Sequence, residues 1–125
     1  MDESIKYHLT ELDIALNPRH PRHSLPEIRK EDKSILDVGC GIGQTIVASQ
    51  IPEGVFVVGI DIDLAPLKYG KEFCNGILYV NAEASFLPFK NKIFDLVISR
   101  VSLPYTNVPR CTQEIARILK PGGRI

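Results

Sequence analysis

Apolar residues recur along the chain with two different periods, and each period predicts one type of element. Near the start they fall on one face of a helix expected over 3–16, at Ile5, Leu9, Leu12 and Leu16. Further on, the segment 55–60 is almost entirely apolar and β-branched. Such a run is typical of a strand that is buried on both faces of a parallel sheet. The pattern therefore predicts both helices and buried strands.

The two patterns alternate after a polar, proline-containing connector at 17–33. Strands are predicted over 34–38, 55–60, 77–80 and 94–99, and helices over 44–50, 64–74 and 108–119. This alternation implies right-handed crossovers and a doubly wound, parallel α/β sheet. We therefore divide the chain into an N-terminal helix with its connector, 1–33, and a main domain, 34–125.

The end of the main domain has its own signal. Lys-Pro-Gly-Gly at 120–123 predicts the end of the last helix, so the chain reaches only the start of a fifth strand. The apolar strand at 94–99 is then an exposed edge of the sheet. Because an exposed edge pairs readily with another chain, we expect it to offer a route to self-association.

Composition narrows the class of protein. The 125 residues suit one domain, and 15 basic residues balance 15 acidic ones. This balance gives no overall attraction to nucleic acid or to an anionic membrane. Three widely spaced cysteines favour reduced thiols, and neither a signal peptide nor a membrane-spanning run is evident. We expect a cytoplasmic protein without a metal site, because His20 and His23 have no third ligand nearby.

The segment 35–44 contains the clearest chemical signal. An apolar strand leads into Asp37, and then Gly39, Gly41 and Gly43 follow at every second position. Glycine adopts backbone angles that are closed to other residues and lets a ligand approach the main chain. An acid followed by such glycines, at a strand-to-helix turn, predicts a ligand cradle that contains one anion.

A second acid suggests what the cradle binds. Asp61 follows Gly39 by 22 residues, a spacing at which a carboxylate can accept both hydroxyls of a ribose. A dinucleotide fingerprint would need its third glycine one residue later, where Gln44 stands. The carboxylate of Asp37 would repel a phosphate and attract an ammonium or sulfonium group. The expected ligand is an adenosine that bears a cation.

At this point the sequence resembles a known family. It contains Asp-Val-Gly-Cys-Gly-Ile-Gly at 37–43, Gly-Ile-Asp-Ile-Asp at 59–63, Asn-Ala-Glu-Ala-Ser-Phe-Leu-Pro-Phe at 81–89, Phe-Asp-Leu-Val-Ile-Ser at 94–99 and Ile-Ala-Arg-Ile-Leu-Lys-Pro-Gly-Gly-Arg at 115–124. In this order, the segments are similar to those of the class I S-adenosylmethionine-dependent methyltransferases, in the branch called the type 11 methyltransferase domain. The resemblance covers 34–125 and implies a Rossmann-like fold.

The resemblance also implies roles for individual residues. At the methionine end of the cofactor, Asp37 would hold the ammonium group, and Gly39, Cys40, Gly41 and Gly43 would form the backbone cradle. At the adenosine end, Asp61 would bind the ribose, Ile62 would pack on the adenine, and Asn81 and the Ala82 N–H would bind its edge. Asn81 departs from the aspartate that is more usual in the family. Ser99 would lie near the sulfonium, and Glu83 would either bind the adenine edge or face solvent.

The implied reaction is methyl transfer from S-adenosylmethionine to a small-molecule acceptor that the sequence does not identify. The sulfonium is already a good leaving group, so no general base is required and we assign no catalytic residue. Cys40 is expected to be a small packed side chain, and 102–105 a turn on the substrate side. Two alternatives stay open: a catalytically silent cofactor-binding fragment or partner subunit, and an NAD-dependent dehydrogenase.

Overall fold

The computed structural model describes residues 2–99 and 108–125 of the chain. The helices and strands follow one another as α1 (Glu3–Leu16), β1 (Ser34–Val38), α2 (Gln44–Ser49), β2 (Phe56–Asp61), α3 (Leu64–Phe73), β3 (Leu78–Asn81), β4 (Phe94–Ser99), α4 (Val108–Ile118) and β5 (Leu119–Arg124). The bounds predicted for α1, β1 and β4 are confirmed. The helices α2, α3 and α4 end one residue earlier than predicted, and the strands β2 and β3 begin and end one residue later.

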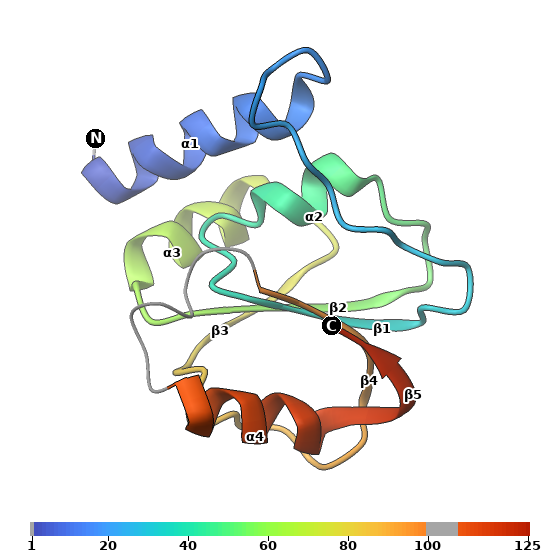
Figure 1. The fold of residues 1–125 in the computed structure, drawn as a ribbon. Coiled ribbons are helices and arrows are strands. Elements are labelled where there is room, and N and C mark those ends of the chain that lie inside the picture. Colours follow the sequence, from blue (N-terminus) through green and yellow to red (C-terminus); the bar gives the residue numbers. More distant parts are fainter. Residues whose placement is uncertain (1, 100–107) are drawn as a thin grey trace.

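The strands form one parallel sheet in the order β3-β2-β1-β4-β5. Figure 1 shows α1, α2 and α3 on one side of this sheet and α4 on the other. From β1 the chain moves outward through β2 to β3, and it then returns to place β4 on the other side of β1. The sheet is therefore doubly wound, and the predicted Rossmann-like α/β fold is confirmed.

Both faces of the sheet are covered by apolar side chains, as the buried strands predicted. On the side of α4 the core contains Leu36, Val38, Val58, Ile60, Ala84, Leu87, Phe94, Val97, Cys111, Ile115 and Ile118. On the opposite side it contains Ile35, Ile46, Val57, Leu96 and Ile98. Strand β1 supplies residues to both cores and is buried along its whole length.

The prediction for the end of the chain is wrong in one respect. Leu119 begins a six-residue strand, β5, that aligns with Phe94 of β4 and continues until Arg124 aligns with Leu96. The register shifts between these two points, which leaves room for the Pro-Gly-Gly segment that locally favours a helix end. Strand β4 is thus paired on both sides where β5 adjoins it, and the edges of the described sheet are β3 and β5. Self-association stays a prediction, without the exposed β4 edge on which it was based.

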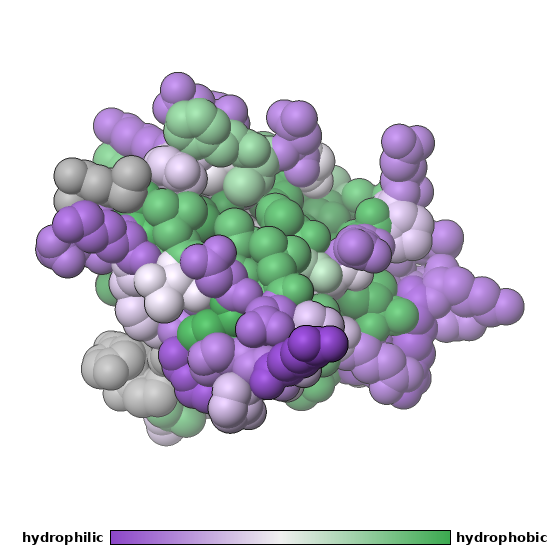
Figure 2. Space-filling view, turned by 90° about the horizontal axis from the view of Figure 1, so that it is seen from above, coloured by the Kyte–Doolittle hydropathy of each residue, from purple (hydrophilic) through white to green (hydrophobic). Residues whose placement is uncertain are grey.

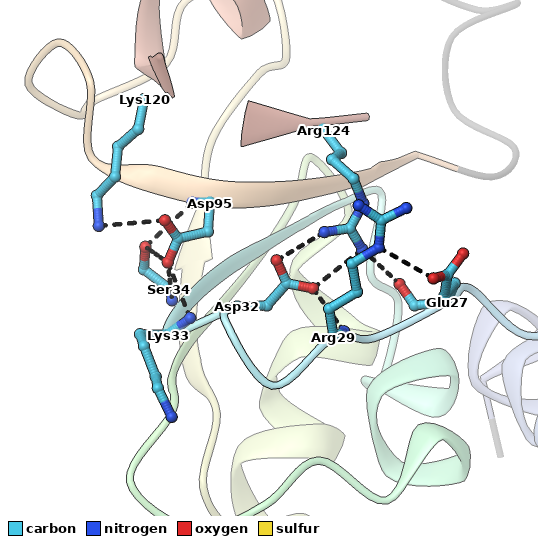
Figure 3. A network of polar contacts seen from close by, with 8 residues as sticks. All are labelled: Glu27, Arg29, Asp32, Lys33, Ser34, Asp95, Lys120 and Arg124. Carbon is cyan, nitrogen blue, oxygen red and sulfur yellow. Dashed lines mark hydrogen bonds and ion pairs between the residues drawn. The ribbon is translucent and has the colours of Figure 1, made fainter. Parts of the chain in front are cut away.

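A polar network fastens β5 to the connector that precedes β1 (Figure 3). The Arg124 guanidinium donates to both carboxylate oxygens of Asp32, at 2.8 and 3.0 Å, and to the carbonyl oxygen of Glu27 at 2.8 Å. Asp32 is buried and also accepts from the backbone N–H of Arg29 at 2.8 Å. This bidentate pair joins two segments that are distant in sequence.

A second carboxylate in the same view anchors the start of β1 (Figure 3). Asp95 in β4 accepts from the backbone N–H groups of Lys33 and Ser34, at 2.8 and 3.1 Å. Lys120 of β5 pairs with the other oxygen of Asp95 at 3.4 Å. The strands β1, β4 and β5 are thereby fixed at the end of the sheet opposite the glycine turn.

Candidate functional site

A cavity of about 680 Å³ lies at the carboxyl ends of β1 and β2. This is the end of a doubly wound sheet at which ligands bind, beside the strand where the winding direction reverses. The cavity is lined by Tyr7, His8, Glu11, Ile14, Ala15, Arg22, Ser24, Asp37, Val38, Gly39, Gln44, Thr45, Ile60, Asp61, Ile62, Ala82 and Ala84. Its size is within the range of about 300–1,000 Å³ that is usual for small-molecule sites.

The glycine turn, 39–43, begins at the cavity next to β1: Gly39 lines the cavity, and the predicted residues Gly41 and Gly43 do not. Gly39, Gly41 and Gly43 have positive φ angles of 76°, 58° and 93°, which confirms that the turn needs glycine. The N–H groups of Gly39 and Cys40 both donate to the carbonyl of Ile60, at 2.8 and 2.9 Å. The turn is therefore tied to the end of β2 through its own backbone.

Of two further predicted residues, Asp37 lines the cavity and Cys40 does not. The side chain of Asp37 is nonetheless buried at 3% exposure. Cys40 is buried at 2% exposure and packs against Gly59, where an added Cβ would lie 2.7 Å from the cysteine sulfur. Burial, followed by the charges of Asp37 and Asp61, raises the pKa of the Cys40 thiol. These contacts support the packed role expected for this cysteine.

We expect Cys40 to react slowly with iodoacetamide at pH 8, because its thiol is inaccessible and its pKa is raised. Cys74 is half-buried and should be alkylated first. Mass spectrometry of the partly labelled native protein tests the order. Labelling of Cys40 before Cys74 would contradict the packed arrangement.

Asp61 stands at the end of β2 and faces the glycine turn. One carboxylate oxygen accepts from the Gly41 N–H at 2.8 Å, and the other accepts from the Asp63 N–H at 3.0 Å. Asp61, the residue predicted to bind the ribose, therefore also organises the turn itself. Each carboxylate oxygen has more than one lone pair, so these two bonds leave acceptor capacity on the cavity side.

The three residues assigned to the adenine lie around the ends of β2 and β3. Ile62 is 65% exposed and lines the cavity, as packing against a planar base would require. The side-chain amide of Asn81 donates to the carbonyls of Asp61 and Ile62, at 2.9 and 3.1 Å. An aspartate could not donate these bonds, which accounts for asparagine at this position. The Ala82 N–H donates to the Asp61 carbonyl at 3.2 Å, so its predicted bond to an adenine nitrogen would have to replace this one.

Ser99 is not part of the main cavity lining. It lies at the end of β4 in a neighbouring cavity of about 430 Å³, and Ser24 lines both cavities. Its hydroxyl oxygen is buried and has no hydrogen-bond partner within 2–99 and 108–125. The place near the sulfonium that was expected for Ser99 stays a prediction. The turn expected at 102–105 lies outside the described residues, and Glu83 is exposed.

The N-terminal helix forms a wall of the cavity. Tyr7, His8, Glu11, Ile14 and Ala15 of α1 all line it, together with Arg22 and Ser24 of the connector. The apolar period predicted the helix but gave no indication of which part of the main domain it would cover. Figure 2 looks onto the face with α1 and shows apolar surface across its middle, bordered by hydrophilic side chains.

His8 fixes α1 to the glycine turn. An added Cβ on Gly41 would lie 2.2 Å from the His8 ring, so the imidazole packs directly on this glycine. Gln44 accepts from the Ile42 N–H at 3.2 Å and donates from its amide nitrogen to His8 Nδ1 at 2.8 Å. Burial lowers the pKa of His8, although nearby carboxylates oppose this, and the neutral ring is the form that accepts a bond.

The other two histidines lie in the connector, and each contacts a backbone group. His20 Nδ1 accepts from the Arg22 N–H at 3.0 Å, and His23 Nδ1 lies 3.2 Å from the carbonyl of Ile14. The part of the chain that the structure describes holds no group of three or more side chains suited to a metal ion. None of its helices is long and apolar enough to cross a bilayer.

Comparison with known proteins assigns the class. The family model of the methyltransferase domain matches residues 36–125. An uncharacterized protein of Methanocaldococcus jannaschii is 40% identical over 100 residues, which cover 77% of this chain and 38% of that protein. An uncharacterized methyltransferase of Bacillus subtilis is 36% identical over 100 residues, covering 75% of this chain and 42% of its own length.

A solved structure supports the same family. The S-adenosylmethionine-dependent methyltransferase of Mesorhizobium loti superposes with a TM-score of 0.62 at 30% identity, over 72% of this chain and 43% of that one. The fold defines a Rossmann-like α/β domain with a cavity at the carboxyl ends of its strands. More particularly, the chain belongs to the methyltransferase domain family, as its sequence predicted. It spans about two fifths of the length of the curated relatives named above, 38% and 42%.

Proposed function

We propose that the chain binds S-adenosylmethionine in the main cavity and transfers its methyl group to a small-molecule acceptor in the cytoplasm. The observation that supports this most directly is Asp37, a buried carboxylate in the cavity wall beside a left-handed glycine turn. A methyl donor with an ammonium and a sulfonium group matches this charge. The family of the chain and the Mesorhizobium loti enzyme support the same ligand.

The charges of the cavity argue against a phosphate-bearing ligand. Asp37, Asp61 and Glu11 line it, and the basic side chain of Arg22 is paired with Glu11 at 3.3 Å. A pyrophosphate here would face carboxylates close to the glycine turn, where attraction would be needed. The NAD-dependent dehydrogenase is therefore the weaker alternative.

The proposed role of the protein in methyl transfer is alignment. When bound, S-adenosylmethionine supplies an activated methyl group on its sulfonium. Asp37 would orient the methionine end of the bound cofactor, and Asp61 would orient its ribose. Helix α1 would limit the access of water, since five of its residues line the cavity. Correct alignment alone lowers the barrier by about 7–11 kcal/mol in favourable cases.

Isothermal titration with S-adenosylmethionine and with S-adenosylhomocysteine tests the proposal. We expect both to bind, with affinities in the micromolar range that is usual for substrates of enzymes, and NADH to show no heat above dilution. A folded sample that binds neither nucleoside would contradict the proposal. Binding without methyl transfer to any of a panel of small acceptors would favour the catalytically silent alternative.

A further inference from the structure

We infer that Tyr79 positions the glycine turn for ligand binding through a contact on the side of the turn away from the cavity. This inference rests on the function proposed above. Tyr79 lies in β3 and is absent from the cavity lining. Its hydroxyl donates to the carbonyl of Ile42, inside the turn, at 2.7 Å. The bond joins the edge strand β3 to the backbone of the glycine turn.

The glycines around Tyr79 show that the ring fits closely between two segments. An added Cβ on Gly43 would lie 2.5 Å from the Tyr79 hydroxyl, and one on Gly70 would lie 2.8 Å from its ring. The same Cβ on Gly70 would lie 2.4 Å from the Ile42 carbonyl. Tyr79 therefore passes between the turn and α3, and glycine at both positions lets it reach the carbonyl.

The sheet register places this contact behind the predicted ligand residues. Gly59 of β2 aligns with Asp37 on one side and with Tyr79 on the other, so all three face the same side of the sheet. Because Gly59 has no side chain, Cys40 of the turn packs into the space between them. The turn thus lies over a row of the sheet in which Asp37 faces the cavity and Tyr79 supports the backbone.

Two side chains hold the turn from opposite sides, in addition to the bonds that its own backbone makes to Ile60. Asp61 accepts from the Gly41 N–H at the front, and Tyr79 donates to the Ile42 carbonyl at the back. Three residues of the turn are glycines with positive φ, so each such bond reduces the conformational freedom that ligand binding would have to remove at a cost in affinity. Burial raises the pKa of the Tyr79 hydroxyl, which therefore keeps its proton and donates at neutral pH.

The test uses Tyr79→Phe, which removes the hydroxyl and leaves the ring between Gly43 and Gly70. Tyr69→Phe is the matched control, since Tyr69 is a half-buried tyrosine of α3 that packs on Phe73. In the unliganded proteins, hydrogen–deuterium exchange is followed in peptides that cover 39–43 and, for comparison, 94–99. We expect Tyr79→Phe to exchange about 5-fold faster at 39–43 only, as the loss of one hydrogen bond implies.

Titration with S-adenosylhomocysteine supplies the second measurement. We expect Tyr79→Phe to bind about 5-fold more weakly than the wild type, and Tyr69→Phe to bind equally well. Unchanged exchange at 39–43, equally faster exchange at 94–99, or faster exchange at 39–43 with unchanged affinity would each overturn the role of Tyr79. A wild-type protein that does not bind the nucleoside would contradict the proposed function instead, and exchange at 39–43 would still decide whether Tyr79 orders the turn.

Discussion

Replacing Asp61 with alanine is expected to weaken S-adenosylmethionine binding by about 1–3 kcal/mol, or roughly 5- to 150-fold in Kd. Two losses contribute to this effect. The variant lacks the carboxylate that would accept the ribose hydroxyls, and it leaves the Gly41 N–H without the acceptor that now lies 2.8 Å away. Isothermal titration of both proteins at one salt concentration measures the change.

The two contributions of Asp61 can be separated. Asp61→Asn keeps an oxygen that can accept from the Gly41 N–H but removes the negative charge, so its Kd should lie between those of wild type and Asp61→Ala. Asp13→Ala is the matched control, because Asp13 is exposed on α1 and does not line the cavity. Equal affinities of wild type and Asp61→Ala would mean that the ribose binds elsewhere.

Local patterns predicted the parts of the site that depend on neighbours in sequence. The spacing of Gly39, Gly41 and Gly43 after an apolar strand was sufficient, because a strand-to-helix turn with positive φ is a property of the turn's own residues. The strand alternation likewise predicted the doubly wound sheet, since crossover handedness leaves few other arrangements.

The parts that could not be predicted depend on contacts between distant residues. His8 meets Gln44 across 36 positions, and Tyr79 meets Ile42 across 37. No period or spacing in either segment indicates these contacts. The helical spacing of the apolar residues in 3–16 shows only that this helix has a buried face.

Strand β5 illustrates how a tertiary contact overrides a local signal. Pro-Gly-Gly at 121–123 is typical of chain that follows a helix, and helix α4 does end at Ile118. The strand forms because Ile93 and Phe94 supply partners for the backbone at 118–119, and because Arg124 binds Asp32 across 92 positions. In the sequence, Arg124 is a polar residue six positions beyond the end of α4, and nothing there indicates that it would bind Asp32.

Replacing Arg124 with alanine is expected to reduce the free energy of unfolding by about 3 kcal/mol, the lower end of the cost of breaking a buried ion pair. The side chain of Asp32 is 3% exposed and that of Arg124 is 23% exposed, so the variant would leave a buried carboxylate with only the Arg29 N–H as donor (Figure 3). Urea unfolding at pH 7, monitored by circular dichroism, measures the change. Arg29→Ala is the matched control, because the guanidinium of Arg29 is exposed and its N–H persists in the variant.

The pH dependence distinguishes this ion pair from simple loss of packing. Burial alone would raise the pKa of Asp32, but hydrogen bonds from Arg124 and from the Arg29 N–H outweigh it and hold the pKa below the ordinary 3.8. The stabilisation is therefore complete above pH 3.8 and is lost as the pH falls through the lower pKa of the folded state. In Arg124→Ala, burial without the guanidinium would raise the pKa of Asp32, so protonation relieves the variant before it affects the wild type. The stability difference between wild type and variant should accordingly be largest at neutral pH and shrink as the pH falls. A difference that persists unchanged below the pKa of the folded state would show that Arg124 stabilises β5 by packing of its side chain and not by its charge.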